Sequence, residues 1–89
     1  MANFEVKKWD MTIVIDGKKY DTTSYLVIVP NGLATTYGNM DAFIHCHNEN
    51  GTETHFNTET EAQEWIDHYG DAVDIRIEHG DEIHAYPLA

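Results

Sequence analysis

The clearest pattern of apolar and polar positions lies between residues 58 and 70. Apolar side chains recur at the i, i+3, i+4, i+7 spacing of one helix face, at Ala62, Trp65, Ile66 and Tyr69. Thr58 can act as the N-cap, and Glu61 three residues later completes a capping box. Gly70 stands where a left-handed residue commonly ends a helix. We therefore predict one amphipathic helix with an apolar face against a sheet and an acidic face in solvent.

The alternation of apolar and polar residues over residues 4–15 changes phase. Phe4 and Val6 occupy even positions, whereas the next four apolar residues occupy odd ones: Trp9, Met11, Ile13 and Ile15. Because a strand has period two, a β-bulge or strand break near Lys7-Lys8 is predicted, which would keep both sets on one face. Asp16-Gly17 then predicts a two-residue type I′ turn.

The return strand, which begins at Lys18, leads into a run of apolar residues without alternation at 25–29. Such a run predicts a central strand covered on both faces, or one face of a dimer contact. Pro30-Asn31-Gly32 is predicted to end it.

Residues 33–41 follow no clear period. One hypothesis is an interaction loop that exposes Leu33, Tyr37 and Met40. The other, which we expect for most of these apolar side chains, is that they fold back onto the core.

Two hairpins flank the predicted helix. Residues 42–48 and 52–56 form the first, with a turn at Asn50-Gly51. In that hairpin His47 would lie opposite Thr54.

In the second hairpin, residues 73–78 alternate and residues 82–86 return after a two-residue turn at Gly80-Asp81. This register would place His84 opposite Ile77 and Tyr86 opposite Ile75. Pro87 is predicted to stop the last strand.

The resulting order is β-β-β-β-α-β-β. It predicts an α+β fold: a bent antiparallel sheet of five to six strands with one amphipathic helix on one face. We expect a single compact domain over residues 1–89, because a chain of this length can bury one modest core.

Of the properties of the composition, the net charge bears most on the function of the chain. Sixteen acidic residues against five basic ones give a formal net charge of −11, and residues 41–89 account for all of it. This charge disfavours direct contact with nucleic acid or an anionic membrane, and it favours a basic protein partner. The alternative is that the carboxylates serve solubility alone. With one cysteine, no signal peptide and no long apolar run, we expect a cytoplasmic protein.

The six histidines raise the question of a metal site. His45, Cys46 and His47, with His55 nearby, are ligand types that zinc prefers. On a strand, however, His45 and His47 share one face while Cys46 points to the other, where His55 would join it. We therefore expect neither a metal site nor a cofactor, and a pH-sensitive or metal-binding use of these histidines with His55 or His84 is kept as an alternative.

No catalytic motif occurs in the sequence, so we expect no enzymatic activity. Carboxylates instead line the predicted helix, the following strand and its turn: Glu61, Glu64, Asp67, Asp71, Asp74, Glu78, Asp81 and Glu82. A continuous carboxylate track could occupy a groove built for phosphates. In size, charge and lack of a catalytic motif, the chain is similar to the small acidic proteins that phages use against restriction enzymes, CRISPR effectors and DNA-repair enzymes.

The sequence thus favours a non-enzymatic inhibitor or modulator of a basic nucleic-acid-binding protein. The carboxylate track would mimic phosphates, and an aromatic side chain such as Tyr37 would anchor the complex. If the gene is carried by a phage, the expected location is the host cytoplasm. The alternative class is a structural or assembly module that acts as a homodimer.

Overall fold

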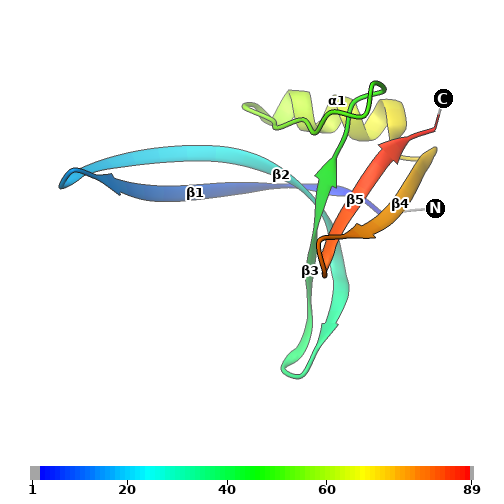
Figure 1. Cartoon of the computed structure of the whole chain (residues 1–89), viewed down its shortest axis with the longest axis horizontal. Helices are drawn as coiled ribbons and strands as arrows, with labels where there is room; N and C mark the ends of the chain where they lie inside the picture. Colours follow the sequence, from blue (N-terminus) through cyan, green and yellow to red (C-terminus); the bar gives the residue numbers. More distant parts are fainter. Residues whose placement is uncertain (1–2, 89) are drawn as a thin grey trace.

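The computed structural model describes residues 3–88 and shows one helix packed on a five-stranded sheet (Figure 1). The elements are β1 (Glu5–Ile15), β2 (Lys18–Thr35), β3 (Gly38–Cys46), α1 (Glu59–Tyr69), β4 (Val73–Glu78) and β5 (Glu82–Pro87). The sheet order is β1-β2-β3-β5-β4. The predicted α+β fold with a single helix is confirmed.

Two details of the sheet differ from the prediction. Residues 52–56 form no strand and contribute only the isolated bridges His47–Glu53 and Tyr25–Phe56. The element order is therefore β-β-β-α-β-β. β3 and β5 pair in parallel, whereas the other neighbours are antiparallel. The sheet is mixed because β5 enters between β3 and β4 after the helix.

β2 belongs to two hairpins and bends between them. Figure 1 shows its first part running beside β1 as a long arm and its last part running beside β3 to a second tip. The register with β3 shifts between Val29 and Leu33, and Asn31 has φ +54°. The segment Pro30-Asn31-Gly32 therefore bends the strand, where the sequence predicted its end.

The predicted β-bulge near Lys7-Lys8 is wrong. β1 pairs with β2 without interruption from Glu5 opposite Ile28 to Ile15 opposite Lys18. Phe4 and Val6 pack against the core beneath α1. Because successive side chains of a strand alternate, the apolar residues at odd positions from Trp9 onward lie on the opposite face.

The core lies between α1 and the sheet and contains Val27, Ile44, Cys46, Phe56, Ala62, Trp65 and Ala85. Trp65 donates its indole N–H to the carbonyl of His47 at 3.1 Å, which joins the helix to the end of β3. The Thr58 hydroxyl caps the helix by accepting the Glu61 N–H at 3.1 Å, as predicted.

Gly70 departs from the predicted left-handed conformation. It has φ −56° and ψ −27°, and its N–H bonds to the carbonyl of Ile66. A Cβ at this position would lie 2.4 Å from that carbonyl oxygen. Close approach of the backbone therefore explains the glycine.

The hairpin of β4 and β5 has a three-residue loop, residues 79–81, because Glu78 pairs with Glu82. The predicted two-residue turn, and the pairs that followed from it, are wrong by one position. His84 lies opposite Arg76 and Tyr86 opposite Asp74.

The tip of the β2–β3 hairpin also differs from expectation. Leu33 pairs with Met40, and they are 44% and 57% exposed, so neither folds back onto the core. Tyr37 at the tip is 98% exposed, as the interaction-loop hypothesis required.

Candidate functional site

The first candidate surface is one face of the arm, which consists of residues 9–24 of β1 and β2 (Figure 1). Its apolar stripe is formed by Trp9, Met11, Ile13, Ile15 and Tyr20, which share a face because Ile13 pairs with Tyr20. These side chains remain 38–55% exposed. A stripe of this size on a two-stranded arm is the pattern of a contact surface.

The opposite face of the arm is suited to water. There the Thr23 hydroxyl donates to Asp10 at 2.7 Å and the Thr12 hydroxyl donates to Asp21 at 2.8 Å. These cross-strand hydrogen bonds join the two strands without apolar cover. The arm is thus amphipathic: the polar side chains of one face are hydrogen-bonded to each other, and the apolar side chains of the other face are exposed.

The surface area of the chain is larger than expected for a compact monomer, as a projecting arm requires. It exposes 6439 Å² at a mass of 10.2 kDa, whereas the scaling for folded monomers gives about 5,300 Å². The excess of about 1,100 Å² exceeds the roughly 800 Å² that each partner buries in a standard stable interface. The radius of gyration is 14.3 Å, against about 12 Å for a globular chain of this length.

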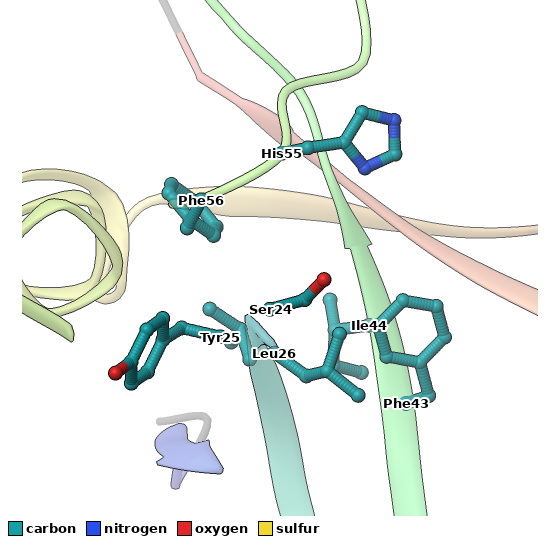
Figure 2. Close-up of a pocket in the computed structure, with 8 residues that line it drawn as sticks. Ser24, Tyr25, Leu26, Phe43, Ile44, His55 and Phe56 are labelled. Atoms are coloured by element: carbon teal, nitrogen blue, oxygen red, sulfur yellow. The ribbon is translucent and has the colours of Figure 1, made fainter. Parts of the chain in front are cut away.

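The root of the arm carries a small hollow of about 80 Å³. Figure 2 shows Tyr25 and Phe56 on its helix side and Leu26 and Phe43 on the other side. This volume is well below the roughly 300–1,000 Å³ of small-molecule sites. The hollow is therefore too small for such a ligand.

The predicted carboxylate track is divided between two faces of the sheet. Glu61, Glu64 and Asp67 are exposed on α1, and Asp71 is exposed just beyond it. Ala85 packs beneath the helix and pairs with Ile75. Alternation along β4 and β5 therefore sends Asp74, Glu78 and Glu82 to the face that α1 does not cover, and Asp81 is exposed in the turn.

That uncovered face contains a histidine–glutamate cluster, which consists of His45, His47, His84, Glu78 and Glu82. His47 Nε2 lies 2.7 Å from His84 Nδ1, and both histidines are 5% exposed. His84 Nε2 lies 3.0 Å from Glu82 Oε1, and His84 Nδ1 lies 3.5 Å from Glu78 Oε2. His45 stacks on His84 with ring centroids 4.6 Å apart.

The cluster keeps its carboxyl groups ionised. The Tyr86 hydroxyl donates to Glu78, and this hydrogen bond, helped by the nearby His84, lowers the pKa of Glu78. The hydrogen bond with His84 likewise lowers the pKa of Glu82. The Tyr86 ring in turn stacks on His47 with centroids 4.0 Å apart. Two carboxylates therefore face two buried imidazoles.

Cys46 and His55, the other potential zinc ligands named from the sequence, lie away from this cluster. Cys46 is 2% exposed in the core beneath α1, and burial raises the pKa of its thiol. It is therefore an apolar core residue and a poor nucleophile. The His55 side chain is 82% exposed, and its Nε2 lies 3.6 Å from Glu53.

Sequence reasoning did not bring His84, Glu78 and His47 together, because it paired β4 with β5 one position out of register and did not expect β5 beside β3. The acids at positions 78 and 82, followed by the histidine at position 84, were the available signal.

No family model, curated protein or solved structure matches the chain. In the part of the chain that the structure describes, no helix combines the length and apolar character needed to cross a membrane.

Proposed function

We propose that this chain is a non-enzymatic assembly module that forms a homodimer through the apolar stripe of its arm. The observation that supports this most directly is the stripe itself, five large side chains on one face of a projecting arm. An isolated two-stranded hairpin is only marginally stable in water, so the arm gains stability when a second surface covers it.

A second copy is an occupant of the right size and chemistry. Two stripes packed face to face around a twofold axis are self-complementary by construction. Asp10 and Asp21, on the far face of each arm, stay in solvent. The excess surface of the monomer, about 1,100 Å² over the scaling for compact chains, is also larger than the roughly 800 Å² that each partner buries in a standard interface.

The test compares Ile13→Glu with Val14→Glu. Ile13 lies in the stripe, whereas Val14 is the next residue, lies on the opposite face and is 61% exposed. We expect light scattering after size exclusion to give a dimer mass for the wild type and for Val14→Glu. Ile13→Glu should give a monomer mass, because two buried charges per dimer would be uncompensated. A wild type that is fully monomeric at a protein concentration of about 100 µM would disprove the proposal. Such a result would mean a dimer dissociation constant on the order of 1 mM or weaker.

A second candidate function is supported by the exposed row of carboxylates on α1. Glu64 and Asp67 lie beside each other on its outer face, and Glu59 and Glu61 continue the row to the N-terminus of the helix. Such a row would attract a basic nucleic-acid-binding protein and compete with its nucleic acid. Only the helix part of the predicted track supports this hypothesis. Tyr37 is the exposed aromatic anchor it would use.

This candidate is tested by removing charge without changing shape. Binding to a basic nucleic-acid-binding protein should weaken with added salt and with Glu64→Gln/Asp67→Asn. The matched control Glu5→Gln/Asp10→Asn removes the same charge from β1 and should bind as the wild type. Equal binding by both double variants would contradict a role for the helix face.

A further inference from the structure

In their neutral form, His47 and His84 turn two lone pairs toward each other. His47 Nδ1 lies 2.9 Å from the carbonyl oxygen of Gly51, and His84 Nε2 lies 3.0 Å from Glu82 Oε1. A carbonyl and an ionised carboxylate only accept hydrogen bonds, so each of these ring nitrogens carries the hydrogen of its neutral imidazole. The other two nitrogens, His47 Nε2 and His84 Nδ1, are then both lone pairs. They lie 2.7 Å apart in a buried site, where two acceptors repel.

Glu78 adds a third ligand atom to the same point. Its carboxylate, His47 and His84 each offer an atom within 4.8 Å of the other two. A proton shared between the histidines would satisfy the two nitrogens alone. A metal ion would also use the Glu78 carboxylate, whose Oε2 lies 3.5 Å from His84 Nδ1.

We propose that His47 Nε2, His84 Nδ1 and the Glu78 carboxylate bind one divalent transition-metal ion of the zinc type. Two histidines and one glutamate form a ligand set that zinc uses in proteins. With zinc–nitrogen bonds of 2.0–2.1 Å, a tetrahedral site places its ligand atoms about 3.3 Å apart. The two nitrogens need to separate by roughly 0.6 Å to reach this value, and the Glu78 oxygen is already 3.5 Å from His84 Nδ1. The fourth position is left for water.

Each ligand already has the outer partner that metal sites require. Gly51 orients His47, Glu82 orients His84, and the Tyr86 hydroxyl donates to Glu78. Such partners fix the tautomer of a ligating histidine and the direction of a ligating carboxylate. The ligands come from three neighbouring strands or their ends, so the sheet holds them in place.

A second grouping, His45 with Glu82 and His84, fits less well. The rings of His45 and His84 are stacked with an interplanar angle of 15°. The lone pairs of an imidazole lie in the ring plane, so stacked rings cannot point them at one ion.

His47, His84 and Glu78 all belong to one chain, so zinc binding at this site does not depend on dimerisation.

The experiment is a titration of the full chain, free of any tag, with ZnCl₂. We expect one equivalent of zinc by calorimetry. Long-range ¹H–¹⁵N spectra should report coordination through Nε2 of His47 and Nδ1 of His84. Glu78→Gln keeps the shape of the side chain and should weaken binding by at least about tenfold; Glu82→Gln, which removes an outer partner, should weaken it by about 10–100-fold. The control His68→Gln, on the exposed face of α1, should bind zinc as the wild type does.

Three results would overturn the proposal. One is no zinc binding at micromolar concentrations with an imidazolium signal at this pair, which would assign the site to a shared proton. Another is zinc-induced change confined to His55 or His68, which would show adventitious surface binding. The last is equal affinity for wild type and Glu78→Gln with both proteins folded by circular dichroism.

Discussion

At the scale of single residues, Gly70 shows how a close approach restricts a position. The end of α1 turns toward β4 with the Gly70 N–H bonded to the Ile66 carbonyl at 2.7 Å. There is no space for a Cβ on this side of the backbone. The glycine is therefore required by close packing against the last turn of the helix itself.

Gly70→Ala should lower the free energy of unfolding by about 1–3 kcal/mol, since the added methyl group forces the backbone to shift. The measurement is chemical denaturation followed by circular dichroism. Asp71→Ala changes the next residue, which is exposed, and it should stay within about 0.5 kcal/mol of the wild type. An unchanged midpoint for Gly70→Ala would show that the turn has room to relax.

Asp41 links the bend of β2 to β1 through a hydrogen bond and an ion pair. Its carboxylate accepts the Asn31 N–H at 3.2 Å and pairs with Lys7 at 3.2 Å. The backbone hydrogen bond, followed by Lys7, lowers its pKa below the ordinary 3.8. A lowered folded-state pKa contributes stability that is present above the unfolded value and is lost as pH falls through the folded one.

Asp41→Asn should therefore remove part of the pH dependence of stability below about pH 4, the range set by the ordinary aspartate pKa. The asparagine oxygen still accepts the Asn31 N–H, so the fold is expected to persist. Urea midpoints measured from pH 2 to pH 6 give the comparison. Parallel curves for wild type and variant would mean that Asp41 does not titrate differently in the folded state.

Loop length at residues 79–81 explains why the candidate metal site could not be predicted. The sequence correctly indicated a β4–β5 hairpin with its turn near Gly80. With a two-residue turn, His84 would have lain opposite Ile77 on the apolar face. His79 has φ +53° and joins the loop, so His84 lies opposite Arg76. A shift of one residue moves every side chain to the other face, and local patterns do not determine it.

At the scale of elements, the change of phase in the apolar pattern of β1 is real, but it does not come from a bulge. A bulge was predicted on the assumption that one strand serves one core. The strand is regular, and its two halves present apolar residues to opposite sides. The helix, by contrast, could be predicted almost completely, because its cap and stripe depend on neighbouring residues alone.

Trp9 offers a direct readout of the arm, since Trp65 is buried at 5% exposure while Trp9 is 47% exposed. In the proposed homodimer the Trp9 indole would be covered. We expect quenching of tryptophan fluorescence by acrylamide to fall as protein concentration rises from about 1 to 100 µM, a span that matches micromolar affinity. Ile13→Glu should remain equally quenched across the range. Concentration-independent quenching of the wild type would place Trp9 outside any contact.

At the scale of the whole molecule, the proposed dimerisation would link stability to concentration. Folded dimer in equilibrium with unfolded monomers gains about 1.4 kcal/mol per tenfold rise in concentration, from the mass-action relation. The thermal midpoint of the wild type and of Val14→Glu should therefore rise with concentration. That of Ile13→Glu should stay constant, which differential scanning calorimetry can measure at two concentrations.

The placement of β5 between β3 and β4 has a consequence for the order of folding. The β1–β2 and β2–β3 hairpins join residues that are close in sequence, whereas the β3–β5 ladder joins residues 44–46 to residues 83–85. Pairing of distant segments is slow, because the intervening chain must first be ordered. The two N-terminal hairpins are thus expected to form early, and the insertion of β5 to complete the sheet last. Since that insertion is what carries His84 to His47, a kinetic signal from this pair would report the final step of folding.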